Sequence, residues 1–422
     1  MGGSPGKRGT DMTINLKALY GNNWQEQAER YEKIREGFQE TFGGSQDAAF
    51  FSAPGRTEIG GNHTDHNHGR VLAAAIDLDI VGMARKTDTG VVRLRSVEYP
   101  RLDTVDLNDL DPRWESSGSQ ALIRGICARC QKLGYQTGGF DCYTQTRVLK
   151  GSGLSSSAAF EILVVTVVSH LYNDGAIDPV TAAQIAQYAE NVYFGKPSGL
   201  LDQMAASVGS VTAIDFADPA EPVIERVGFD LNAYGHALCV VDTGGSHADL
   251  TSDYASIPPE MKAVAAFWGK EFLREVDETV FYDQLGEVRK AVGDRAVLRA
   301  MHFFDDDRLA HEEAEALKVG NFSGFLEMVR ASGKSSVQRL QNVYSPANPI
   351  EQGITLAVSL SERLLGRHGA SRVHGGGFAG TIQAYVPFDM LDQYRAGMER
   401  VFGPGSCYVL SVRGAGGTKV ER

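Results

Sequence analysis

A short run of glycines and serines, residues 150–158, constrains this chain more than any other feature. It reads Lys-Gly-Ser-Gly-Leu-Ser-Ser-Ser-Ala and lies between an expected strand and an expected helix. Glycines let the backbone approach an anion, successive N–H groups can point toward it, and a helix N-terminus adds the positive end of its dipole. An ordinary turn with a serine N-cap explains one glycine and one serine, but not the whole run. We therefore predict a phosphate-binding loop that consists of Gly151, Ser152, Gly153, Leu154, Ser155, Ser156 and Ser157.

A second polar motif, residues 55–69, lies between two apolar stretches that are expected to be strands. Its sequence is GRTEIGGNHTDHNHG. This density of Asn, His and Asp suits a polyhydroxylated ligand, because each buried hydroxyl needs a hydrogen-bond donor or acceptor. His63, His66 and His68 could instead bind a metal, but they have no clear tetrahedral partner set, and a plain surface loop is the third alternative. The motif favours sugar recognition.

Two carboxylates, Glu190 and Asp202, are twelve residues apart around a Gly/Pro break at residues 195–199. If Glu190 ends a helix and Asp202 begins the next element, the turn can bring both side chains to one cleft. One could hold Mg²⁺ while the other acts as a base, and phosphoryl transfer needs both services. The alternative is a pair of ordinary surface carboxylates. A glycine loop at residues 374–381 is weak alone and gains meaning only beside these motifs.

Composition and charge limit the remaining possibilities. A chain of 422 residues suggests two domains with a cleft between them. The net charge of −12, without a basic run, argues against a nucleic-acid or membrane partner. The sequence shows neither a membrane span nor a signal core, so we expect a cytoplasmic protein. Five cysteines, including the C-x-x-C of Cys127 and Cys130, fit reduced thiols better than a disulfide framework.

Hydrophobic periodicity predicts an α/β fold whose first half is led by strands and whose second half is mostly helical. The expected helices are residues 24–42, 119–133, 158–171, 182–194 and 390–402, and the expected strands are residues 49–53, 71–84, 91–97, 141–148, 237–241, 381–386 and 407–412. A shift in composition near residues 210–235 marks the expected domain boundary. We predict a flexible tail at residues 1–20, an N-terminal domain at residues 21–215 and a C-terminal domain at residues 216–422.

Together, the three motifs resemble those of the GHMP small-molecule kinases, over about residues 20–415. The pattern G-R-x-x-x-x-G-x-H-T-D in residues 55–65 is similar to the galactokinase signature. The resemblance implies a two-domain α/β (α+β) protein with an N-terminal domain like ribosomal protein S5 domain 2 and a C-terminal ferredoxin-like domain. The active site would lie between them. It implies a sugar 1-kinase that uses ATP and Mg²⁺, as a monomer or weak homodimer.

The resemblance also assigns roles to individual residues. The loop from Gly151 to Ser157 would wrap the ATP phosphates, and Ser157 and Glu190 would hold Mg²⁺. Asp202 would accept the proton of the galactose C1 hydroxyl, and Arg56 would lie beside it. The residues expected to contact the sugar are Asn62, His63, Thr64, Asp65, Tyr254 and Gly376.

The sugar motif departs from the usual galactokinase form at several positions. Asn62 stands where Glu is usual, His66 where Tyr is usual, and Glu58 and Gly60 where Asn and a bulkier apolar residue are usual; His374 is also unusual. The reaction type is therefore better defined than the sugar. The alternatives are a 1-kinase for galacturonate, an N-acetylhexosamine or arabinose, and a catalytically silent sugar sensor, although the intact serine run and Asp202 favour an enzyme.

Overall fold

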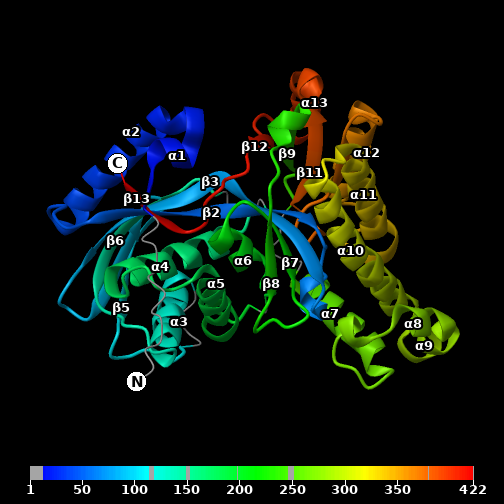
Figure 1. The fold of residues 1–422 in the computed structure, drawn as a ribbon, viewed down its shortest axis with the longest axis horizontal. Coiled ribbons are helices and arrows are strands. Elements are labelled where there is room, and N and C mark those ends of the chain that lie inside the picture. The colour runs from blue at the N-terminus through cyan, green and yellow to red at the C-terminus, as the bar shows by residue number, and fades with distance from the viewer. Residues whose placement is uncertain are drawn as a thin grey trace, which may run out of the picture.

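A computed structural model describes residues 13–113, 118–148, 153–196, 198–245, 251–378 and 380–421. Within these residues the chain forms one nine-stranded and one four-stranded sheet, both covered by helices (Figure 1). None of the helices in the described part of the chain is both long and apolar enough to cross a bilayer.

The larger sheet is built around two long antiparallel strands, β2 and β3. Its strand order is β1-β13-β2-β3-β6-β4-β5, and β7 pairs with β3 and with β8. The strands are β1 (Thr13–Asn15), β2 (Ala49–Gly60), β3 (Arg70–Lys86), β4 (Val91–Ser96), β5 (Tyr99–Asp106), β6 (Phe140–Thr146), β7 (Val211–Asp215), β8 (Val223–Val227) and β13 (Thr418–Glu421). The pairing of β2 with β3 shifts register between Pro54 and Arg56 and again between Glu58 and Gly60. Bulges of this kind re-aim side chains, and these two lie in the predicted sugar motif.

The smaller sheet is antiparallel and has the order β10-β11-β9-β12. Its strands are β9 (His236–Asp242), β10 (Ala370–Val373), β11 (Thr381–Pro387) and β12 (Cys407–Leu410). One face packs on α12 and α13, and the other contributes Leu238, Val240 and Tyr385 to the main core. The ring of Tyr385 contacts Phe325 of α11 edge-on, with 5.1 Å between centroids.

The helices follow the apolar periodicity of their sequences. They are α1 (Leu16–Tyr20), α2 (Trp24–Phe42), α3 (Ser119–Lys132), α4 (Ser156–Tyr172), α5 (Pro179–Tyr188), α6 (Leu201–Val208), α7 (Thr251–Ala266), α8 (Glu278–Asp283), α9 (Leu285–Val292), α10 (Asp294–Lys318), α11 (Phe322–Ser335), α12 (Gly353–Leu365) and α13 (Leu391–Phe402). Helix α4 is apolar on all sides and is accordingly buried in the main core. A short π-helical segment, Ala189–Phe194, continues α5 and carries Glu190.

Most expected elements are present, with informative differences. Helix α2 has the predicted bounds, whereas β2 runs seven residues past the expected end at Ala53, so the first part of the sugar motif is strand rather than loop. The predicted tail is wrong for residues 13–20, which form β1 and α1. Residues 1–12 lie outside the described part. The domain boundary at residue 215 stays a prediction, but β8 and β13 follow it in sequence and still join the larger sheet.

The cysteines are free thiols, as the sequence predicted. All five cysteines are free and buried. Cys127 and Cys130 lie on α3, and burial raises the pKa of the Cys130 thiol to about 12. A thiol with so high a pKa is a poor nucleophile and a poor metal ligand at neutral pH.

Candidate active site

Three segments that are distant in sequence meet at Asp202, in the first turn of α6. Arg56, on β2, donates from Nε to Asp202 Oδ1 over 2.7 Å, and its Nη2 lies 2.7 Å from the same oxygen. Ser155, just before α4, donates its hydroxyl to Asp202 Oδ2 over 2.5 Å. Burial alone would raise the pKa of Asp202, but the Arg56 charge and the Ser155 hydroxyl outweigh it and hold the pKa below its ordinary value. The carboxylate is therefore ionised at neutral pH, and it stays about one-third exposed.

Backbone geometry around Ser155 explains why its side chain faces Asp202. Ser155 has φ 59° and ψ 58°, the left-handed region that a residue with a Cβ rarely adopts. It precedes α4 as the N-cap, but its hydroxyl makes no capping hydrogen bond. The hydrogen bond to Asp202 replaces the cap, and strained conformations of this kind are concentrated at functional sites.

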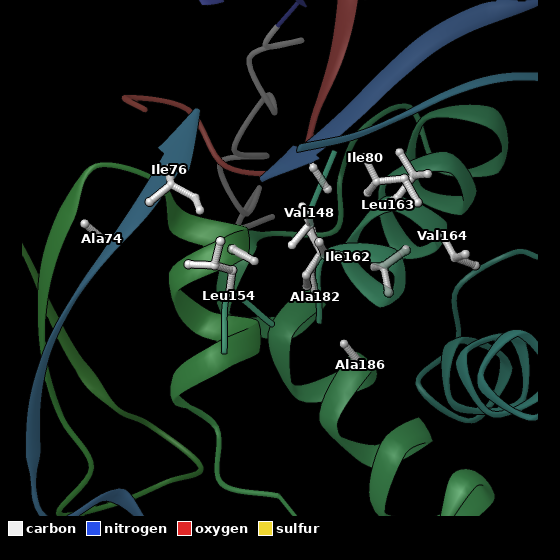
Figure 2. Close-up of a cluster of buried hydrophobic side chains, with 14 of the residues drawn as sticks. Ala74, Ile76, Ile80, Val148, Leu154, Ile162, Leu163, Val164, Ala182 and Ala186 are labelled. Carbon is white, nitrogen blue, oxygen red and sulfur yellow. The ribbon is translucent and has the colours of Figure 1, made fainter. Parts of the chain in front are cut away.

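Residues 153–157 are the part of the predicted phosphate-binding loop that the structure describes. Leu154 is fully buried in the main core with Val148 and Ile162 (Figure 2). Its carbonyl accepts a hydrogen bond from the Arg56 N–H, so it anchors the loop to β2. Leu154 can therefore offer a phosphate only its backbone. The predicted residues Gly151 and Ser152 lie outside the described residues.

Glu190 lies beside this loop with both carboxylate oxygens engaged. Its Oε1 accepts from Ser157 Oγ over 3.1 Å and from Lys196 Nζ over 2.8 Å, and its Oε2 accepts from Gln203 Nε2 over 2.8 Å. Gln203 also donates to Glu161 of α4, over 3.1 Å. Burial, and then the Glu190 charge, raise the pKa of Glu161 well above its ordinary value and so favour its protonated form. Glu190 is thus held from three sides.

The amide of Asn62, predicted to contact the sugar, is fully used inside the protein. Its Nδ2 donates to Glu58 Oε1 over 2.7 Å and to the Gly375 carbonyl over 2.6 Å, and its Oδ1 accepts from Asn342 over 2.8 Å. Glu58 in turn pairs with Arg372 at 2.9 Å. Asn62 is completely buried. It orders the loop and has no donor left for a ligand.

The next three residues of the motif have different environments. His63 lies 3.0 Å from the Gly376 carbonyl, and burial lowers its pKa to about 3, so it is neutral. Thr64 is buried and donates its hydroxyl to the carbonyls of Gly61 and Arg70, which is a structural role. Asp65 packs against Gly199, where a Cβ would overlap its carboxylate. The sugar motif is thereby brought next to the chain that leads into Asp202.

The glycine loop after β10 closes the other side of this region. The Tyr254 hydroxyl donates to the Gly377 carbonyl over 2.7 Å, and a Cβ at Gly376 would overlap the Tyr254 ring. His374 is buried between Thr57 and Thr381, at 3.1 and 3.0 Å, and burial lowers its pKa well below the ordinary value. All three predicted motifs therefore meet in one region.

Sequence reasoning missed four charged or polar residues of this region: Glu161, Lys196, Gln203 and Arg372. Gln203 directly follows Asp202 and could have been suspected from its position. The alternative of a histidine metal site finds no support, because no group of three or more potential ligands clusters within the described residues.

Comparisons with known proteins agree with this geometry. The galactokinase galactose-binding signature matches residues 36–86, and the N-terminal domain of GHMP kinases matches residues 121–210. A galactokinase of Streptomyces coelicolor is 29% identical over 87% of this chain and 92% of its own, and one of Lactococcus lactis subsp. lactis is 29% identical over 92% and 96%.

Solved structures give the same picture. The crystal structure of Lactococcus lactis galactokinase complexed with galactose aligns with a TM-score of 0.80 at 25% identity, over 92% of this chain and all of that one. A mevalonate kinase aligns at 0.61 with 14% identity, over 86% of this chain and 99% of that one, which is a likeness of fold. The fold and the grouping of the motifs define a GHMP kinase, as predicted. Within that class, the galactose-binding signature, the curated relatives and the solved structure are all those of galactokinases, and the chain is a sugar kinase.

Proposed function

We propose that this protein transfers the γ-phosphate of ATP to the anomeric C1 hydroxyl of galactose, giving galactose 1-phosphate and ADP. The observation that carries the proposal is the contact of Asp202 with Arg56 and Ser155, next to the pair of Ser157 and Glu190. A silent sugar sensor would have no need for an ionised carboxylate held in this way.

Each group would have a defined task. Asp202 accepts the proton of the C1 hydroxyl as that oxygen forms its bond to the γ-phosphorus and the bond to the ADP oxygen breaks. Arg56 keeps Asp202 ionised and offers positive charge where negative charge develops on the phosphoryl oxygens. The N-terminus of α4 and the N–H groups of residues 153–157 bind phosphate oxygens.

The residues around Glu190 fit a divalent cation. Mg²⁺ takes oxygen ligands and uses one or two carboxylates together with phosphate oxygens. Ser157 Oγ and Glu190 Oε1 lie 3.1 Å apart, and Oε1 also accepts from the Lys196 ammonium, which supports a cation site at this oxygen. Ser157 and Glu190 would hold Mg²⁺, which when bound neutralises charge on the β- and γ-phosphates. Gln203 orients Glu190 for this task.

The sugar would be recognised by His63, Asp65 and Tyr254, with the Gly376 backbone. Asn62 and Thr64 would shape the loop rather than contact the ligand, because their hydrogen-bonding groups are used internally. A galacturonate carboxylate near Asn62 would find no free amide donor and would approach Glu58. Galactose is therefore favoured over galacturonate.

A panel of sugars tests the proposal. The purified protein is incubated with Mg·ATP and galactose, glucose, galacturonate, N-acetylgalactosamine or arabinose, ADP release is followed, and the product is located by NMR. We expect turnover with galactose and phosphate on C1. If the protein released ADP no faster with galactose than with glucose, its C4 epimer, the assignment of galactose would be wrong. The cytoplasmic location and the monomer or weak dimer remain predictions.

A further inference from the structure

Lys196 occupies an unusual position, because a largely exposed side chain ends on a buried carboxylate. Its side chain is 56% exposed, whereas that of Glu190 is 3% exposed, and Nζ lies 2.8 Å from Oε1. The backbone N–H of Lys196 donates to the Glu190 carbonyl over 3.1 Å, after Gly195 at φ 79°. The backbone is therefore anchored, while the stem of the side chain lies at the surface and can move without disturbing the core.

The charges at the site are matched one to one. Arg56 compensates Asp202, and Lys196 compensates Glu190. Lys196 contacts the same Oε1 that accepts the Ser157 hydroxyl, which is the oxygen that the proposed function gives to the metal. An ammonium and a dication cannot share one carboxylate oxygen without strong repulsion. Metal binding at Glu190 must therefore displace Lys196.

A displaced ammonium needs a new anionic partner close by. The polyphosphate of ATP supplies one, because Ser157, which donates to Glu190, is also the last residue of the loop that would hold the phosphates and lies in the first turn of α4. We propose that, in the nucleotide-free protein, the Lys196 ammonium binds the Glu190 oxygen that the metal would bind, and that it moves to an ATP phosphate when Mg·ATP binds. This inference rests on the proposed function, and it adds a phosphate-binding residue and an order of events to it.

Metal binding without nucleotide tests the first half of the proposal. Mn²⁺ is titrated into the protein, and free Mn²⁺ is measured by EPR. Lys196→Met removes the competing charge but keeps the length of the side chain, so it should bind Mn²⁺ roughly tenfold more tightly than the wild type. Lys196→Arg should behave like the wild type. Unchanged or weaker Mn²⁺ binding by Lys196→Met would show that the lysine is only a surface ion pair, or a support for Glu190.

Nucleotide binding tests the second half. Affinity for the Mg²⁺ complex of a non-hydrolysable ATP analogue is measured by calorimetry. Because Lys196→Met no longer competes with the metal, its affinity for the analogue is compared after its measured gain in Mn²⁺ affinity is subtracted. So corrected, Lys196→Met should lose roughly tenfold in affinity and Lys196→Arg much less. The matched control is Lys262→Met, an exposed lysine that pairs with Glu271 at 3.5 Å instead of Glu190, and it should change neither affinity. If Lys196→Met gained as much affinity for the analogue as it gains for Mn²⁺, the transfer to phosphate would be refuted.

Two further measurements separate failure of this inference from failure of the proposed function. Glu190→Gln should weaken Mn²⁺ binding; if it does not, Glu190 is not the ligand and the role of Lys196 falls with it. Turnover of galactose by the wild type is measured independently. A wild type that phosphorylates galactose, together with a Lys196→Met variant of unchanged metal and nucleotide affinity, would overturn only the inference about Lys196.

Discussion

Asp202 receives an ionic contact and a hydroxyl hydrogen bond at once, and this combination sets its protonation state. Arg56 and Ser155 hold its pKa below the ordinary value, so the group is ionised over the whole neutral range. It is thus a base that is weak but always available, and its position matters more than its strength. Any loss of activity between pH 6 and pH 5 must then come from another group.

Asp202→Asn removes the proposed proton acceptor and keeps the shape of the side chain. We expect kcat to fall by at least about a hundredfold, because in the proposed mechanism Asp202 is the group that accepts the proton of the sugar hydroxyl. Binding of the ATP analogue should change little. Initial rates of ADP release and calorimetry check the two expectations. A variant that kept most of its kcat would require a different base.

A second prediction for a single residue concerns Asn62 and the stability of the fold. In Asn62→Asp, a carboxylate would face Glu58 Oε1 and the Gly375 carbonyl, which now accept from the amide at 2.7 and 2.6 Å. The loss should be on the order of 3 kcal/mol in the free energy of unfolding, measured in urea. In Glu58→Gln/Asn62→Asp a donor faces the new carboxylate, so the double-mutant cycle should show favourable coupling of at least about 1 kcal/mol. Additive single effects would mean that residues 58 and 62 act separately.

At the scale of elements, strand β2 shows both what the sequence could predict and where it stopped. Apolar residues from Ala49 to Ala53 predict a strand there. In the same way, the apolar periodicity of helix α2 predicts the residues at which that helix begins and ends. The strand continues to Gly60 because Thr57 and Glu58 are paired with Gln383 and Arg372, more than 300 residues later. Local pattern cannot identify such partners, so polar residues in a buried strand resemble a loop.

Helix α10 carries an acid that no sequence pattern marks. Glu313 is fully buried beneath Gly60, where a Cβ would overlap its carboxylate, and neither of its oxygens has a hydrogen-bond partner. Burial raises its pKa well above the ordinary value. The folded protein therefore binds a proton here that the unfolded chain has lost above about pH 4.5, so this group's contribution to stability is lost as the pH rises.

Glu313→Gln imitates the protonated acid at every pH. Its free energy of unfolding should exceed that of the wild type more at pH 7 than at pH 5, by up to about 1.4 kcal/mol per pH unit. Urea denaturation at both pH values measures this. Glu315→Gln, on the same helix but half exposed, is the control and should show no such trend. An equal difference at pH 5 and pH 7 would mean that Glu313 is ionised in the folded protein.

At the scale of the whole molecule, the first and last strands that the structure describes are joined in the larger sheet. Strand β1 pairs in parallel with β13, and β13 pairs with β2 (Figure 1). The sequence predicted the principal strands of the two sheets but not this closure, because β1 and β13 are three and four residues long and are ordered by partners far away in the sequence. The predicted tail and the simple division at residue 215 both overlooked it.

Asp79 of β3 connects the segments next to these two strands. Its carboxylate is completely buried and accepts from Arg30 of α2 at 2.6 Å, from Arg413 before β13 at 2.9 Å, from Tyr20 of α1 at 2.6 Å, and from Ser52 of β2. Burial alone would raise the pKa of Asp79, but Arg30 and Arg413 outweigh it and lower the pKa. Its contribution to stability is therefore present at neutral pH and is lost as the pH falls through this low value.

Asp79→Asn should leave two buried guanidinium groups without a countercharge, so we expect the free energy of unfolding to fall by about 3–5 kcal/mol at pH 7. The difference from the wild type should be smaller at pH 3 than at pH 7, since below about pH 4 the unfolded chain takes up a proton at Asp79 that the folded protein, with its lowered pKa, does not. Asp88→Asn, in the exposed turn after β3, is the matched control and should cost little. Urea denaturation at the two pH values, read together with protease sensitivity of the chain ends, checks the result. A small, pH-independent loss would mean that the pairing of β1, β13 and β2 holds the ends together without the buried charges.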